Sequence, residues 1–180
     1  MKVDEILRGP PSAYAGIGSR LTPGDVLYLM EQIAAFLACF GHRLRSGCAP
    51  GADQAFERGS GGRYELYLPW PEFERRPTSI VQLVRPSAFA YEIAARHHPA
   101  WIRLQRGAQA LQARNSHQIL GADCESPSRF VLCWTPDGAT TVTSSRTGGT
   151  GQALRIADAY GVPVWNLQRA DHRAEWEAVL

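Results

Sequence analysis

The sequence predicts an α/β protein with a Rossmann-like, doubly wound fold and a mainly parallel sheet of five strands or slightly more. Short apolar runs of strand length alternate with longer amphipathic segments of helical period, which is the pattern of a parallel sheet with helical crossovers. Glycine-rich turns follow three of the expected strands, where such folds bind their ligands. Because the chain has 180 residues and shows no repeat or linker, residues 1–180 are expected to form a single domain.

The first half of the chain holds three expected strands, at residues 12–17, 42–45 and 64–68. The first helix is expected to begin at Thr22 and Pro23, because threonine caps helices and proline suits their first position. Apolar residues recur from Val26 to Leu37 at helical spacing, and Gly41 ends the pattern. A second helix is expected from Gly51 to Arg58. These elements form two β-α units in succession.

The second half begins with a proline-broken stretch, residues 70–86, which is longer than an ordinary connection of ~2–6 residues. Helices are expected at 88–97 and 101–120, followed by a continuously apolar strand at 130–134. A polar loop, residues 135–147, leads into a helix that reaches Tyr160. A strand at 162–165 and a last helix complete the chain. The two long loops are candidates for a lid or a partner contact.

Composition and charge exclude several classes of protein. The hydrophobic content of 44% and the charged content of 20% are ordinary for a soluble protein, and a net charge of +2 is too small to favour non-specific nucleic-acid binding. No signal peptide or apolar run near 18 residues is present, so a cytoplasmic protein with no membrane partner is expected. The four cysteines lack the spacing of zinc ligands, and neither a metal nor a cofactor is predicted.

Three strand-to-helix turns are expected to meet at one edge of the sheet, because the carboxyl ends of parallel strands lie together. The N-termini of the following helices offer free N–H groups to an anion there. The first turn supplies the candidate ligand-binding residues Gly16, Gly18, Ser19 and Arg20. It lacks the third glycine of a dinucleotide fingerprint and the lysine of a phosphate loop. A tight turn that simply needs glycine remains the alternative.

The second turn contains Ser46, Gly47 and Gly51 as candidate ligand-binding residues. Asp53 lies in the first turn of the following helix and is a candidate catalytic residue that orients a sugar hydroxyl or activates water. The alternative is a carboxylate that only caps the helix. Glu57, one helical turn later, is a second catalytic candidate, against the alternative of a solvated surface residue.

The third turn is the sharpest signal, with three glycines in four residues between a polar loop and a clear helix. The backbone entropy that these glycines cost is best explained by cradling of a phosphate. The candidate ligand-binding residues in this turn are Gly148, Gly149, Thr150, Gly151 and Gln152.

Three further candidates lie outside the turns. Arg114 is expected to neutralise phosphate charge, as a candidate catalytic residue, and His117 lies on the same helix three positions later. Trp134 ends the fourth strand and is a candidate for stacking on a base, with burial in the core as the alternative. Arginines predominate between residues 75 and 114, which suits a phosphorylated ligand or a short nucleic-acid strand, or marks only a solvated face.

The three turns together resemble the SLOG superfamily, which includes the DNA-processing protein DprA (Smf) and the LOG phosphoribohydrolases. Residues 46–56, SGCAPGADQAF, look like the SGGARGID-type segment of DprA, and Arg114-Asn115 resembles its Arg-Asn element. The run from Gly148 to Gly151 resembles the GGxGT loop of LOG enzymes. The matches span residues 14 to about 166 and are nearest to small, phage-type DprA-like proteins.

This resemblance implies a nucleotide-derived ligand across the strand ends, and it places Asn115 among the candidate ligand-binding residues. The first hypothesis is binding of a nucleotide or nucleoside phosphate, with hydrolysis of the N-glycosidic bond of a nucleoside 5′-monophosphate if the protein is an enzyme. The alternatives are a DprA-like protein that binds single-stranded DNA during DNA processing or recombination, and a sensor or sponge of a nucleotide signal. A homodimer is expected by the same resemblance.

One residue departs from the LOG pattern. Arg155 stands where LOG enzymes carry a catalytic glutamate after the GGxGT loop. The usual LOG chemistry is therefore in question, and an acid would have to come from Asp53, Glu57 or Asp137.

Overall fold

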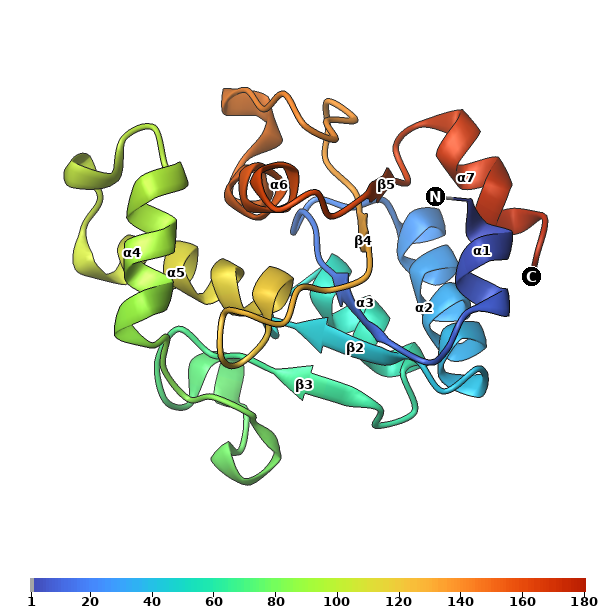
Figure 1. Ribbon diagram of the computed structural model, residues 1–180, viewed down its shortest axis with the longest axis horizontal. Coiled ribbons are helices and arrows are strands. Elements are labelled where there is room, and N and C mark those ends of the chain that lie inside the picture. The colour runs from blue at the N-terminus through green and yellow to red at the C-terminus, as the bar shows by residue number, and fades with distance from the viewer. Residues whose placement is uncertain (1) are drawn as a thin grey trace.

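A computed structural model describes residues 2–180 and confirms the expected α/β fold (Figure 1). The sheet has five parallel strands in the order β3-β2-β1-β4-β5. These strands are β1 (Ala13–Gly16), β2 (Arg43–Ser46), β3 (Tyr64–Leu66), β4 (Val131–Cys133) and β5 (Val164–Asn166). The described chain also holds seven α-helices: α1 (Val3–Arg8), α2 (Gly24–Cys39), α3 (Ala52–Gly59), α4 (Ala88–His97), α5 (Arg106–Leu120), α6 (Thr150–Ala159) and α7 (Ala170–Glu177).

Helices cover both faces of the sheet, as the doubly wound pattern requires. Figure 1 shows α4, α5 and α6 on one side of the strands and α1, α2 and α7 on the other. Side chains alternate along each strand, so Tyr14 packs with the α2 and α3 side whereas its neighbour Ala15 packs with α4, α5 and α6. The two resulting cores bury apolar surface on both sides, which stabilises an all-parallel sheet.

The structure differs from the sequence-based expectation in three places. Helix α1 was not expected, because six residues with only two buried apolar positions, Val3 and Ile6, show no clear period. The helix expected at 101–120 is divided into a short 3-10 turn, η3 (Trp101–Arg103), and α5. The irregular stretch 70–86 contains two further 3-10 turns, η1 (Phe73–Arg75) and η2 (Thr78–Ile80).

The strand order sets the place of the site. From β1 the chain first winds to β2 and β3 on one side, and later to β4 and β5 on the other. The crossovers that leave β1 and β4 therefore diverge, and a crevice opens beyond the carboxyl ends of these two strands. No helix within residues 2–180 is long and apolar enough to cross a membrane.

Candidate functional site

A cleft of about 450 Å³ lies beyond the carboxyl ends of β1 and β4, at the point where the strand order reverses. All three glycine-rich turns and one face of α5 contribute to it. Its predicted lining residues are Gly18, Ser19, Arg20, Asp53, Arg114, Asn115, Gly148, Gly149 and Thr150. Its additional lining residues are Ile17, Leu21, Ala49, Leu111, Gln112, Gln118, Pro136, Arg146, Thr147 and Ala153. The structure thus brings most of the predicted residues to one place.

The first turn forms one wall of the cleft through Ser19 and Arg20. The Ser19 N–H donates to the carbonyl of Trp134 at 3.1 Å, and the Ser19 hydroxyl accepts from the N–H of Leu21 at 3.0 Å. The Arg20 side chain is exposed. Gly16 does not line the cleft: a Cβ there would lie 2.6 Å from a methyl carbon of Leu44, so its position serves packing.

The second turn lies directly against the first. Gly51 has a φ of +88°, and a Cβ at this position would lie 2.7 Å from the carbonyl oxygen of Ser19 and 2.9 Å from Cα of Arg20. Glycine alone suits this combination of left-handed backbone and close approach. The turn therefore holds the backbone of Arg20 in place by direct contact.

Gly47 makes room for an arginine that comes from a distant part of the chain. A Cβ at Gly47 would fall on the guanidinium of Arg114, which reaches over this turn from α5. The Gly47 N–H donates to Asp53 Oδ2 at 3.1 Å. Asp53 and Arg114 are both buried, and their closest atoms, Oδ2 and Nη1, lie 3.4 Å apart.

Asp53 and Arg114 form a compensated pair at the base of the cleft. Burial raises the pKa of the Asp53 carboxyl, and the charge of Arg114 and the N–H of Gly47 act against that rise. Burial likewise lowers the pKa of the Arg114 guanidinium. Within residues 2–180, the Nε–H of Arg114 is buried and has no hydrogen-bond partner. A buried donor of this kind is costly unless a ligand satisfies it.

Ser46 and Glu57 lie behind this pair rather than in the cleft. The Ser46 hydroxyl donates to Glu57 Oε1 at 2.6 Å, and Glu57 also pairs with Arg76 from the irregular stretch. Burial raises the pKa of Glu57, while the hydrogen bond from Ser46 and the charge of Arg76 lower it. Glu57 is therefore buried and paired, which corrects the surface alternative, and its carboxylate does not line the cleft.

The first residues of the third turn expose their backbone to the cleft, whereas Gly151 and Gln152 lie away from it. Gly148 and Gly149 are exposed, α6 begins at Thr150, and the Asn115 amide donates to the carbonyl of Gly149 at 3.3 Å. Gly151 does not line the cleft. Gln152 is buried against α4, where its amide donates to the carbonyl of Ala94 at 2.9 Å.

Arg155 braces α6 and does not reach the cleft. Its guanidinium donates to the carbonyl of His97 at 2.8 Å, to the hydroxyl of Thr143 at 2.7 Å and to the side-chain carbonyl of Gln152 at 2.9 Å. The position at which LOG enzymes carry their glutamate is therefore a structural cross-link here.

Trp134 does not line the cleft, and its ring belongs to the core on the α2 side of the sheet, with Phe130 and Leu132. This placement follows from the alternation of side chains along a strand, since residues 130, 132 and 134 point to the same face. Trp134 is 7% exposed, so it is buried in the core and does not offer its ring to a base.

Arg146 is the main residue that sequence reasoning missed. It lines the cleft, is exposed, and forms no ion pair with any carboxylate in the described chain, and the same is true of Arg20. The sequence does place an arginine two residues before the glycine turn, which could have indicated a role at the site. It lies in a loop without helical or strand periodicity, so the direction of its side chain could not be predicted. The cleft is thus lined by three arginines, Arg20, Arg114 and Arg146, and by one carboxylate, Asp53, which already pairs with Arg114.

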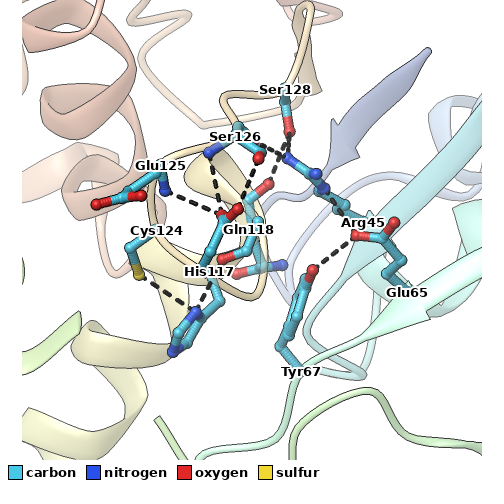
Figure 2. A network of polar contacts seen from close by, with 11 residues as sticks. Arg45, Glu65, Tyr67, His117, Gln118, Cys124, Glu125, Ser126 and Ser128 are labelled. Atoms are coloured by element: carbon cyan, nitrogen blue, oxygen red, sulfur yellow. Dashed lines mark hydrogen bonds and ion pairs between the residues drawn. The ribbon is translucent and has the colours of Figure 1, made fainter. Parts of the chain in front are cut away.

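A polar network fastens the carboxyl end of α5 to the sheet (Figure 2). Arg45 on β2 is bound by Glu65 at 2.9 Å and donates to the carbonyl of Ser126 at 2.6 Å. The Ser128 hydroxyl donates to the backbone carbonyl of Gln118, whose side-chain amide reaches Asp53 Oδ2 at 3.4 Å. The network thereby fixes the helix that supplies Arg114 and Asn115 to the cleft.

His117 belongs to this network and not to the cleft, which corrects the hypothesis that it points into the crevice. Its Nε2 accepts from the N–H of Ser87 at 3.1 Å, so Nδ1 carries the proton and donates to the carbonyl of Gly121 at 2.9 Å. Burial lowers the pKa of the imidazole. The residue is a neutral structural histidine.

The cleft is thus equipped to hold an anion. Its surface carries two arginines that form no ion pair in the described chain, a buried guanidinium with a free N–H, and the N-terminus of a ten-residue helix. Within residues 2–180, no group of three or more His, Cys, Asp or Glu side chains is arranged to hold a metal ion.

Comparison with known proteins supports the fold. A scan against protein-family models finds no match, and neither does a search of curated proteins. Among solved structures, DNA processing protein A from Helicobacter pylori, described for its single-stranded DNA binding mode, is similar with a TM-score of 0.57. The identity is 18%, over 99% of this chain and 76% of that chain. This likeness shows a shared fold and agrees with the DprA resemblance at that level.

Proposed function

We propose that this protein binds single-stranded DNA and that the cleft holds a phosphate of the strand between Arg20, Arg146 and the N-terminus of α6. The observation that carries the proposal is the charge arrangement: Arg20 and Arg146 are unpaired within the described chain, and both lie at the cleft beside the glycine turn. Arginine forks and helix N-termini are the groups that bind phosphate in proteins. The fold shared with a protein described as binding single-stranded DNA supports the choice of ligand.

Binding of the phosphate backbone of DNA suits this site better than catalysis does. Asp53 is the one carboxylate that lines the cleft among residues 2–180, and it is engaged by Arg114, Gly47 and Gln118. An acid for N-glycosidic cleavage would need its carboxyl free to reach a substrate. The expected function is therefore binding without turnover.

A free nucleoside phosphate is the second candidate ligand, favoured by the size of the cleft. A volume of about 450 Å³ lies within the range of sites for small molecules, ~300–1,000 Å³. Leu21 and Leu111 offer apolar surface beside the charged groups. This candidate predicts tight binding of a mononucleotide, whereas the first predicts an affinity that grows with the length of the strand.

The test is the fluorescence anisotropy of a labelled oligothymidylate of about 16 nucleotides, titrated over a range of salt concentrations. We expect Arg20→Ala and Arg146→Ala each to weaken binding about 10- to 100-fold, since a charge-assisted hydrogen bond contributes roughly 1.5–3 kcal/mol. The salt dependence of log K should fall by about 0.7 for each arginine removed. Arg63→Ala is the matched control, because Arg63 is an exposed arginine before β3, at the opposite edge of the sheet.

The outcomes separate the candidates. Equal losses in all three variants would show that binding is non-specific and would overturn the role of the cleft. Direct binding of adenosine monophosphate, measured by calorimetry, with no affinity for the oligonucleotide would favour the free nucleotide. Absence of both kinds of binding would contradict the proposed function as a whole.

A further inference from the structure

The loop between β4 and α6 is closed on itself by a single carboxylate. Asp137 Oδ2 accepts from the hydroxyl of Thr147 at 2.6 Å and from the hydroxyl of Ser144 at 2.9 Å. The Thr147 hydroxyl in turn accepts from the N–H of Ser144 at 2.8 Å. These contacts join the beginning of the loop to its end, immediately before Gly148.

The base of the same loop is held by a residue of the neighbouring strand. The Asn166 amide donates to the Thr135 hydroxyl and to the carbonyl of Ala139, both at 2.7 Å. Asn166 thus fixes the first part of the loop to β5. The distal part, which carries Arg146, is tied to this base by Asp137.

Arg146 lies within the segment that Asp137 closes. It occupies the short turn η4 (Ser145–Thr147), and its N–H donates to the Ser144 hydroxyl at 3.1 Å. The two hydroxyl donors to Asp137 Oδ2, Ser144 and Thr147, therefore flank Arg146. Thr147 is buried and lines the cleft beside Gly148, so the geometry of this closure reaches the glycine turn.

We propose that Asp137 is a positioning residue for the ligand: its closure of residues 137–147 presents Arg146 to the cleft. This inference rests on the proposed function for its ligand, a phosphate of a single DNA strand. Asp137 is not among the residues that line the cleft, so it acts through Arg146 and not by contact.

The protonation state of Asp137 supports this role. Burial acts to raise the pKa of its carboxyl, but the hydrogen bonds from Thr147, Ser144, Thr135 and the N–H of Ala139 together lower the pKa to about 2. The carboxylate is therefore ionised at neutral pH and accepts the hydroxyls of Thr147 and Ser144 at once. An ionised acceptor of this kind is unsuited to the role of general acid that the sequence left open for it.

The first test is limited proteolysis with trypsin, which reports on the loop without any ligand. We expect Asp137→Ala to accelerate cleavage of the bond between Arg146 and Thr147 about tenfold, because cleavage requires local opening of the segment. Asp123→Ala is the matched control: Asp123 is an exposed aspartate that closes a different loop by accepting from Ser126 and Glu125. It should leave cleavage after Arg146 unchanged.

The second test is a double-mutant cycle on binding of the labelled oligothymidylate. We expect Asp137→Ala to weaken binding about fivefold in the wild-type chain and to have almost no effect in the Arg146→Ala background. Asp137→Asn, which retains one acceptor, should fall between the wild type and Asp137→Ala. Circular dichroism melts should show that Asp137→Ala retains the fold, as befits an exposed residue.

These outcomes separate the two proposals. Unchanged proteolysis and unchanged binding in Asp137→Ala would overturn the positioning role. Equal losses of binding in both backgrounds would also overturn it, since a positioning residue acts through Arg146. If the wild-type chain binds no oligonucleotide but Asp137→Ala still exposes Arg146 to trypsin, the proposed function fails while the closure of the loop stands.

Discussion

The carboxylate of Asp53 and the guanidinium of Arg114 meet at 3.4 Å with both side chains buried, although the two residues lie 61 positions apart along the chain. Removing one member leaves the other charge buried without a partner. We expect Asp53→Ala to lower the free energy of unfolding by about 3–5 kcal/mol. Urea denaturation measures this, with Asp4→Ala as control: Asp4 belongs to the exposed pair with Arg8, worth about 0–1 kcal/mol. Similar losses in both variants would contradict the buried pair.

Gly47 provides the second prediction. A methyl group at this position would overlap the Arg114 guanidinium, so Gly47→Ala should displace that side chain. We expect a loss of about 1–3 kcal/mol in the free energy of unfolding, together with weakened oligonucleotide binding. Gly107→Ala is the matched control, because no atom lies within 4 Å of its added methyl. Since Gly107 lies in the first turn of α5, its replacement should leave the free energy of unfolding nearly unchanged. A neutral Gly47→Ala would count against the close approach of Arg114 to this turn.

Arg155 gives the third prediction. Arg155→Glu introduces the residue type that LOG enzymes carry after their glycine loop, but the side chain at this position contacts His97, Thr143 and Gln152 outside the cleft. We expect no release of base from nucleoside monophosphates and a loss of about 2–4 kcal/mol in stability, because several charge-assisted hydrogen bonds disappear. Chromatography of the reaction mixture and chemical denaturation measure the two effects. Appearance of free base would show that residue 155 reaches the ligand after all.

His117 predicts a pH dependence of stability. Burial holds the pKa of His117 below its ordinary value, whereas the imidazole of the unfolded chain takes up a proton near pH ~6.5. As the pH falls below about 6.5, the unfolded state therefore binds more protons, and this contribution to stability is lost. Protonation of Nε2 would also remove the acceptor for the N–H of Ser87, the residue that caps α4.

The measurement compares the wild type with His117→Gln by urea denaturation between about pH 7.5 and pH 5.5, the range about the ordinary pKa of histidine. The groups that face the imidazole are Tyr67, Cys124 and the charge of Asp123. They are unchanged in the variant, so the difference between the two curves isolates His117. We expect the wild type to lose its advantage as the pH falls; parallel curves would refute the assignment.

Much of the fold could be predicted because local periodicity and tertiary structure agree. The strand-length apolar runs and Gly41 mark their elements directly in the sequence. The start of α2 is displaced by one residue from the prediction: Pro23 holds the N-cap position, and the Thr22 hydroxyl donates to the carbonyl of Ser19 instead of capping the helix. Helix α1 could not be predicted in this way, because only Val3 and Ile6 are buried in it. Two apolar positions do not define a period, and the packing against α2 and α7 that stabilises this helix is a tertiary effect.

The site was less predictable, because a residue type does not specify the direction of a side chain. Gln152 and Arg155 follow the glycine turn on α6, but the helix turns them toward α4. Trp134 could have been assigned to the core by counting from Phe130 along the strand. Arg146 lies in a loop with no period, and its place depends on the hydroxyl contacts of Asp137.

Because Gly51 contacts the backbone of Ser19 and Arg20, the first two glycine-rich turns form one structural unit. Neither turn can change in length or shape without moving the other, although residues 21–45 separate them in the sequence. Exchanging only one turn for that of another protein would place a side chain at position 51 against the carbonyl of Ser19, or move that carbonyl against Gly51. The space between them has room only for the hydrogen of a glycine. A redesign of this cleft must therefore exchange both turns together, and natural variation in one turn should be accompanied by matching variation in the other.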